Sequence, residues 1–277
     1  MDRQIRHLGA MWSGTASLLA YVMLVLMFSA SFAAAEQDDT RLSLSIGAFI
    51  TDRDSEARAD ASNRDLGTVI DLEDDLGLDS SDTVLRLDGF YRLADKHRID
   101  FSTFDLSRSA SKQIDRELSW KDTTFVLNAN VQSDFDLSIY KVAYTWSFLK
   151  NERGFLGATV GLYVADIGTS LDAPLIGSGE VGDATAPLPV VGLRGEYRLA
   201  ERWALRASGE FFFLEYNDFD GALIDLLLGL EFDLSKNIDV GIGANSVRLD
   251  IEVDRDVLHG AFDWQYDGIL AYLKFDF

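Results

Sequence analysis

Apolar residues recur at every second position along most of this chain, and this two-residue period is the feature that most restricts its fold. In an extended strand, successive side chains point to opposite faces, so residues two apart share a face. At the C-terminus one such face carries only apolar residues, namely Ile269, Ala271, Leu273, Phe275 and Phe277. The other face includes Lys274 and Asp276. The segment therefore predicts a strand with one purely apolar side.

The same alternation recurs in about ten segments, which predicts an all-β protein. These segments are residues 41–50, 82–93, 98–103, 138–148, 156–164, 191–199, 203–213, 222–234, 238–245 and 268–277. Short polar connections at 93–97, 149–153, 199–202 and 234–237 alternate with longer segments at 53–81, 110–133, 167–187, 216–221 and 252–262. Such a regular order is expected when antiparallel strands run up and down, with all turns at one end.

The composition of the two faces indicates which side meets the surroundings. A water-soluble β-sandwich also alternates, but it hides its apolar face and exposes its charges. Here the polar faces mix basic and acidic residues with glycines, which suits a crowded lumen. An apolar strip of about ten residues on a tilted strand spans roughly 25 Å of hydrocarbon. We therefore expect a closed antiparallel up-and-down transmembrane β-barrel of about ten strands, within a range of eight to twelve.

The lumen of this barrel is expected to hold charges of both signs. The predicted lumen charges are Arg86, Asp88, Arg92, Arg98, Asp100, Lys141, Arg194, Glu196, Arg198, Arg206, Glu210, Asp225, Glu231 and Lys274. An unpaired charge in such an interior is costly, so paired networks are expected. Eight strands enclose a space that side chains just fill, whereas sixteen leave a wide channel. At about ten strands we expect a narrow or closed pore.

The N-terminal segment and the composition restrict the location of the protein. Arg3 and Arg6 precede a long apolar stretch that ends at Ala33, Ala34 and Ala35, which predicts a cleaved signal peptide over residues 1–35. A retained membrane anchor is the alternative. The chain has 277 residues, no cysteine and a formal charge of −21, so a disulfide framework is excluded and nucleic acid is a poor partner. Residues 36–277 are expected to form a single domain.

Together these features resemble the small outer-membrane β-barrels of Gram-negative bacteria. The resemblance covers roughly residues 41–277, and the terminal residues Ile269, Ala271, Leu273, Phe275 and Phe277 match the family's C-terminal insertion signal. It implies location in the bacterial outer membrane, contact with membrane lipids and lipopolysaccharide, and recognition by the barrel-insertion machinery during assembly. It also implies a monomer. Candidates for aromatic girdles at the membrane interfaces are Trp120, Trp146, Trp203, Trp264, Tyr197 and Tyr216.

Signals for chemistry are weak in this sequence. After processing, His97 and His259 remain, and His259 lies near Asp254, Asp256 and Asp263. No serine nucleophile lies close to either histidine in sequence, so we expect no enzymatic activity and no cofactor. The acidic run after Ile70 supplies weak metal-ligand candidates, namely Asp71, Glu73, Asp74, Asp75 and Asp79, without the order of a calcium loop. Alternatively, the run is solvated or folds into the barrel mouth against lumen arginines.

The sequence therefore predicts a non-enzymatic outer-membrane barrel that acts as a narrow pore or as a structural scaffold. Barrels of this size do unrelated jobs, so the fold alone does not fix the activity. A lipid- or peptide-modifying enzyme and a surface adhesin that acts through its loops remain the alternatives.

Overall fold

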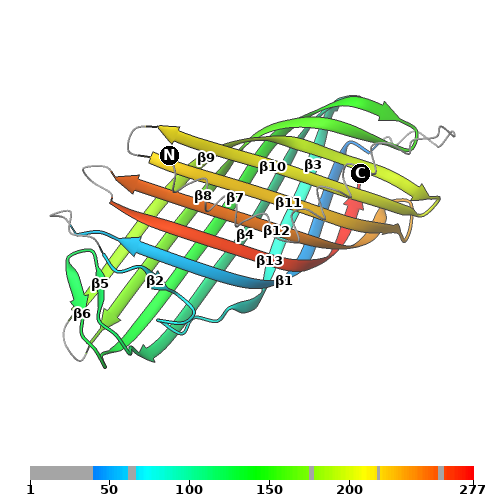
Figure 1. Ribbon diagram of the computed structural model, residues 1–277. Helices are drawn as coiled ribbons and strands as arrows, with labels where there is room; N and C mark the ends of the chain where they lie inside the picture. Colours follow the sequence, from blue (N-terminus) through cyan, green and yellow to red (C-terminus); the bar gives the residue numbers. More distant parts are fainter. Residues whose placement is uncertain (1–39, 62–66, 175–177, 217–218, 255–258) are drawn as a thin grey trace.

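Ten long antiparallel strands close into a barrel in the computed structural model, which describes residues 40–61, 67–174, 178–216, 219–254 and 259–277 (Figure 1). The barrel strands are β1 (Leu42–Ala59), β3 (Ser81–Ala94), β4 (His97–Gln113), β7 (Asn130–Asn151), β8 (Gly154–Ala173), β9 (Ser178–Ala200), β10 (Trp203–Tyr216), β11 (Phe219–Asp233), β12 (Ile238–Asp254) and β13 (His259–Asp276). Each strand pairs with the next barrel strand in sequence, and β13 pairs with β1 to close the ring. The predicted fold class is confirmed.

Three short strands lie outside this ring. β2 (Ile70–Asp71) pairs with the far end of β1, while β5 (Leu118–Trp120) and β6 (Thr123–Phe125) form a hairpin of their own. The short connections and the C-terminus lie at one end of the barrel, which we call the turn end, and β2, β5 and β6 lie at the other, the loop end. Periplasmic turns are short in outer-membrane barrels, so we expect the turn end to face the periplasm.

The strands extend much further toward the loop end than expected. The structure places 53–59, 110–113, 130–133, 167–173 and 178–187 in strands, so the loops at 53–81, 110–133 and 167–187 are shorter than predicted, most of all the last. The loop predicted at 252–262 is likewise shortened by β12 and β13. The loops were predicted too long because each strand was taken to end where its outward-facing residues stop being apolar.

The face that is apolar changes along each long strand, and β7 shows this change most clearly. Toward the turn end, Val142 and Trp146 point outward and are exposed, while Lys141 is buried in the lumen. Toward the loop end the polarity is reversed, since Phe135 is buried inside and Asp134 is exposed outside. Exposed apolar residues suit lipid, whereas an apolar interior with a polar exterior suits water. The barrel therefore continues beyond the membrane as a water-facing wall.

Residues 67–80, which we call the cap segment, fold into the mouth at the loop end. Ile70, Leu72, Leu76 and Leu78 are between 0% and 3% exposed, because they pack into the apolar interior of the extended wall. Of the two alternatives for the acidic run, the structure has the one that folds inward.

The signal peptide predicted over residues 1–35 lies outside the described residues. Among the residues that are described, no helix is long and apolar enough to cross a membrane.

Candidate functional site

The lumen is the candidate site, and near the turn end it is lined by charged side chains at alternate strand positions. The strand register points Arg86, Asp100, Lys141, Glu210 and Glu231 inward, where each is at most 5% exposed. Asp225 and Lys274 are buried beside them. The remaining predicted lumen charges, which are partly exposed, are Asp88, Arg92, Arg98, Arg194, Glu196, Arg198 and Arg206.

Lys141 and Glu210 form the centre of the first ion-pair network. The Lys141 Nζ atom lies 2.6 Å from Glu210 Oε2 and 2.9 Å from the Tyr163 hydroxyl. Tyr163 also donates to Asp225, and Arg194 donates to the second oxygen of Glu210 at 3.0 Å. Charge-assisted bonds of this kind are the strong ones in a dry interior. Five strands, β7 to β11, are thereby tied together.

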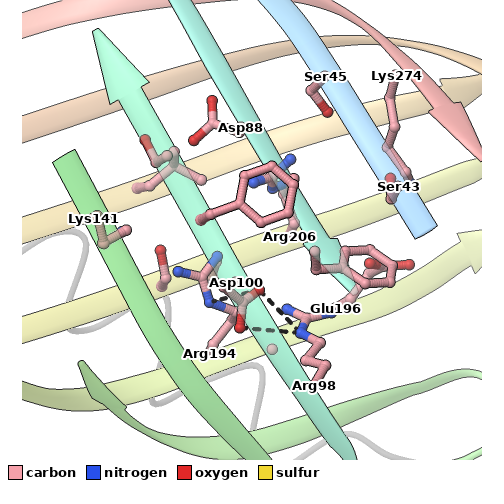
Figure 2. A pocket seen from close by; sticks show the side chains of 18 of the residues that line it. Ser43, Ser45, Asp88, Arg98, Asp100, Lys141, Arg194, Glu196, Arg206 and Lys274 are labelled. Carbon is pink, nitrogen blue, oxygen red and sulfur yellow. Dashed lines mark hydrogen bonds and ion pairs between the residues drawn. The ribbon is translucent and has the colours of Figure 1, made fainter. Parts of the chain in front are cut away.

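The first network continues on both sides through shared partners. Asp100 lies 3.1 Å from Arg98 and 3.8 Å from Arg194, and Figure 2 shows these two guanidinium groups beside the same carboxylate. On the other side, Asn245 donates to Asp225 and accepts a hydrogen bond from Arg86 at 2.6 Å. Arg86 also pairs with Asp88 at 3.0 Å.

Glu231 is the centre of a second network closer to the turn end. It accepts hydrogen bonds from Lys274 at 2.8 Å, from the Tyr272 hydroxyl at 2.7 Å and from Arg206 at 3.1 Å. Lys274 also lies 3.0 Å from Asp239. At the rim, Arg198 pairs with Asp233 at 2.6 Å, and the Arg92 guanidinium lies 5.8 Å from the centre of the Phe90 ring.

A small polar cavity of about 50 Å³ remains between these networks (Figure 2). Its lining includes Arg98, Asp100, Arg206, Glu196 and Lys274. A cavity needs about 10–15 Å³ on this measure to hold one water molecule, so this one has room for a few waters. A larger solute does not fit without movement of the charged side chains.

An apolar layer fills the lumen between the charged networks and the cap segment. It is formed by Phe49, Phe104, Ile139, Leu188, Leu223, Val247, Leu249, Trp264 and Tyr266. The Tyr266 ring contacts three aromatic neighbours, with centroid distances of 5.1 Å to Phe49, 5.8 Å to Phe104 and 4.7 Å to Trp264. Only about 10 Å³ of space is left there. Side chains therefore fill most of the lumen at this level.

The apolar layer is absent from the predictions made from the sequence, although a signal for it is present there. The lumen residues Gly241 and Gly243 lie at alternate positions of β12. The same alternation continues through Val247, Leu249 and Ile251, so these side chains also point inward. Following the register past the last outward apolar residue would have found the layer.

The aromatic girdle predictions have mixed outcomes. Trp146 and Trp203 are 48% and 42% exposed and point outward near the turn end, as a girdle requires. Trp264 is 1% exposed and belongs to the lumen layer, and Trp120 is buried in the β5–β6 hairpin, so both were wrongly assigned. Tyr197 is half-buried with its hydroxyl 3.4 Å from Arg153, and the Tyr216 side chain lies outside the described residues.

The acidic candidates in the cap segment contact basic residues of the chain itself. Glu73 accepts hydrogen bonds from Arg108 and from the Ser55 hydroxyl, the latter at 3.0 Å. Asp75 pairs with Arg116. Burial raises the pKa of Asp75, but the hydrogen bonds from Arg116 and from the Asp71 backbone outweigh it and hold that pKa below its usual range.

The other acidic candidates bind backbone groups or face solvent. Asp71 accepts a hydrogen bond from the Asp74 backbone, and the side chains of Asp74 and Asp79 are exposed. Among the side chains that are described, no group of three His, Cys, Asp or Glu residues could hold a metal ion. The cap segment is therefore held in the mouth of the barrel by contacts of its acidic residues with the chain itself.

The two histidines lie at opposite ends of the barrel. His97 begins β4 at the turn end, where its Nδ1 atom is 2.5 Å from the Tyr144 hydroxyl. His259 begins β13 and pairs with Asp254 through the backbone; both side chains and Asp256 lie outside the described residues. The Asp263 side chain is exposed on the outer wall.

The predicted insertion signal lies on the closing strand β13 and at its end. Ile269, Leu273 and Phe277 are 56%, 43% and 66% exposed on the outer surface. Ala271 is also exposed, and Phe275 is half-buried. The backbone of Phe277 exchanges hydrogen bonds with Leu42.

Comparison with known proteins gives similarity in structure only. No family model and no curated protein sequence matches the chain. The outer membrane protease OmpT of Escherichia coli has a TM-score of 0.57 at 9% identity, over 87% of this chain and 99% of that one. Ail of Yersinia pestis has a TM-score of 0.38 at 13% identity, over 85% and 99% of the two chains. The toluene transporter TodX of Pseudomonas putida has 0.38 at 9% identity, over 87% and 91%.

The fold and the surface agree with each other. A closed antiparallel barrel satisfies every backbone group without an edge in the hydrocarbon region, and the outward face of this one is apolar around the half near the turn end. The chain is a transmembrane β-barrel with the fold of bacterial outer-membrane proteins.

Proposed function

We propose that this protein is a closed, non-enzymatic structural barrel of the outer membrane and does not act as a diffusion pore. The observation that carries the proposal is the apolar layer around Trp264 and Tyr266, which crosses the lumen between the charged networks and the cap segment. An ion would have to leave water to pass this layer, and the cost of desolvating a charge is several kcal/mol. A filled lumen also stiffens the barrel, because each layer bonds strands that are distant around the ring.

Single-channel recording in planar bilayers tests this proposal. The refolded protein should give no conductance steps at any voltage that the bilayer tolerates. The matched control is the double variant Phe104→Ala and Trp264→Ala, which removes two rings from the apolar layer and leaves the charged networks in place. It should show small steps, after a heat-modifiability gel has established that it is folded. Regular steps from the unaltered protein would contradict the proposal and favour a narrow pore.

The absence of catalysis is tested separately. Cells that carry His259→Ala or His97→Ala should have the same lipid A and outer-membrane peptidase profiles as cells with the unaltered protein. Nucleophilic catalysis needs a base within about 3 Å of a nucleophile. A lipid A or peptidase profile that changes with His259→Ala, but not with His97→Ala, would contradict the proposal. It would indicate an enzymatic role for residues at the loop end.

A further inference from the structure

The wall of the barrel has a seam between β9 and β10 at the loop end. β9 pairs with β8 over residues 178–197, but it pairs with β10 only from Val191 onward, and that pairing ends at Phe211. Beyond this point β10 pairs with β11 alone. Figure 1 shows β9 continuing beside β8 while β10 and β11 run in another direction. We call residues 184–190 of β9 and 212–214 of β10 the seam.

Two prolines mark the β9 side of the seam as a strand edge. The β8–β9 register continues without a shift past Pro187 and Pro189, which pair with Val164 and Leu162. A proline lacks the N–H group, so an unbroken ladder requires its nitrogen to face away from the paired strand. Both nitrogens therefore face the seam. Prolines at an edge also discourage pairing with another strand.

Two apolar side chains at the seam, Leu214 and Ala186, are less covered than their inward positions predict. Leu214 has the parity of the lumen residues Phe212 and Glu210, yet it is 42% exposed, whereas they are 7% and 0% exposed. Ala186 is partly exposed, while Ala165, its direct partner on β8, is 0% exposed. The incomplete cover follows from the missing strand neighbour.

The seam lies at the outer boundary of the membrane-facing surface. On the outside of β8 and β9, the apolar pair Val164 and Pro187 is followed by the polar pair Asp166 and Thr185, whose side chains are 2.6 Å apart. On β10, Phe213 is 57% exposed at the seam. The lipid-facing surface is therefore continuous with the seam.

The corresponding gap on the opposite wall is covered by the chain itself. β3 and β4 stop pairing at Arg86 and Phe104, and the cap segment fills the space beyond with Leu72, Leu76 and Leu78. Just beyond the seam, Lys121 bonds Val181 and Thr123 bonds Glu180. Within the described part of the chain, Pro187 and Pro189 are exposed on the outer side of the seam, whereas Leu188 and Val190 point inward and are 0% exposed.

We propose that the seam is a docking groove for an acyl chain of an outer-leaflet lipid. An acyl chain is apolar, narrow and already present at this height, so it matches the surface that continues into the seam from the membrane-facing band. The Leu188 side chain at the base of the seam lines the small apolar pocket of the lumen layer together with Leu223. A bound chain would cover Leu214 and Ala186 from outside and leave the charged networks untouched.

The absence of cysteine from the chain makes a direct test possible. The variants are Ala186→Cys at the seam and Ala165→Cys one strand away, which are matched in size, height and inward direction. Each is reconstituted in nanodiscs that contain a phospholipid with a maleimide group on its acyl chain. The outward residue Val160, replaced by cysteine, gives the rate for full contact with lipid.

Ala186→Cys should react at least tenfold faster than Ala165→Cys and approach the rate of Val160→Cys. Equal rates for Ala186→Cys and Ala165→Cys would overturn the proposal. Reaction of Ala186→Cys with a water-soluble charged thiol reagent, but not with the lipid reagent, would overturn it in favour of a hydrated groove. A disulfide-linked dimer of Ala186→Cys would assign the groove to a second copy of the chain and also overturn it.

Discussion

At the scale of single residues, the lumen is held by buried charges whose partners come from distant strands. Glu231 on β11 has Lys274 from β13 and Arg206 from β10 within 3.1 Å. Taking such charges out of water is costly, so a complete network contributes modest stability, whereas a broken one leaves an uncompensated buried charge. The lumen is therefore expected to be sensitive to single changes of charge.

Replacing Glu231 by glutamine should lower the free energy of unfolding by about 3–5 kcal/mol, because two cations lose their shared carboxylate in a dry interior. Urea unfolding in lipid vesicles, followed by tryptophan fluorescence, measures this change. The control is Asp95→Asn, which breaks the exposed pair with Lys150 at 2.5 Å and should cost less than about 1 kcal/mol. Adding Lys274→Met to Glu231→Gln should recover part of the loss, and strictly additive effects would contradict the coupling.

Replacing Arg53 should raise the free energy of unfolding, whereas replacing Glu231 should lower it. Arg53 is 5% exposed on the inner face of β1 near the cap segment, and among the described residues neither terminal nitrogen of its guanidinium group has a hydrogen-bond partner. Burial, together with the neighbouring Arg108, lowers the pKa of Arg53. Arg53→Met should therefore stabilise the barrel, by about 1–4 kcal/mol if it follows other buried charges that were replaced by apolar residues. A loss of stability in the same urea assay would show that Arg53 has a partner in solution.

At the scale of elements, the cap segment is held by both apolar packing and ion pairs. Leu72, Leu76 and Leu78 anchor it inside the mouth, while Asp75 pairs with Arg116 and Glu73 with Arg108. The apolar contacts are independent of pH. The ion pairs require ionised carboxylates, so acid should loosen the segment before it unfolds the barrel.

Acidification should raise the rate of hydrogen exchange in residues 67–80. The folded-state pKa of Asp75 lies below its unfolded value of about 3.9. Its contribution to stability is therefore complete above that unfolded value and is lost as the pH falls through the folded-state pKa. Exchange measured by mass spectrometry between pH 6 and pH 2, corrected for the intrinsic rate, should show this change. Asp75→Asn should show fast exchange already at pH 6, and identical profiles for the two proteins would contradict the prediction.

The seam makes a separate prediction about its prolines. Replacing Pro187 and Pro189 by threonine restores two N–H donors at an exposed strand edge, and unprotected edges pair with other chains. The double variant should form more dimer and aggregate during refolding, measured by sedimentation in detergent. A proline at an edge acts against such pairing, so the unaltered protein should remain monomeric under the same conditions.

The sequence predicted the membrane-spanning half of each strand better than the half beyond the membrane. Leu44 and Ile46 alternate with Ser43, Ser45 and Gly47, because this part of the strand has lipid on one side and a polar lumen on the other. Beyond Ile50 the chain continues as Asp52, Asp54 and Glu56 on the outside of the same strand. Acidic residues at an exposed position carry no helix or strand signal of their own, so the strand was taken to end there.

At the scale of the whole molecule, the same strands pass through two environments, lipid near the turn end and water near the loop end. Near the turn end the outside is apolar and the inside is charged, as lipid requires, and near the loop end both are reversed, as water requires. The charged inward residues could be listed from the sequence because their parity is fixed by the lipid-facing strip. Which charge pairs with which could not be predicted, because Lys141 and Glu210 are 69 residues apart and meet only when the ring closes.

Phe277, the terminal aromatic residue, lies where β13 meets β1 to close the ring, and its role can be tested by substitution. The backbone of Phe277 bonds Leu42 and Arg41, but its side chain is 66% exposed. Phe277→Ala keeps those backbone bonds, so the stability of the refolded protein should change by no more than about 0.5 kcal/mol, as for other surface substitutions. If the insertion machinery reads this ring, the amount of protein in the outer membrane of cells should still fall severalfold. Ile242→Ala, at an outward position on β12 that is 57% exposed, is the matched control and should reach the membrane normally; equal yields of the two variants would contradict a signal at Phe277.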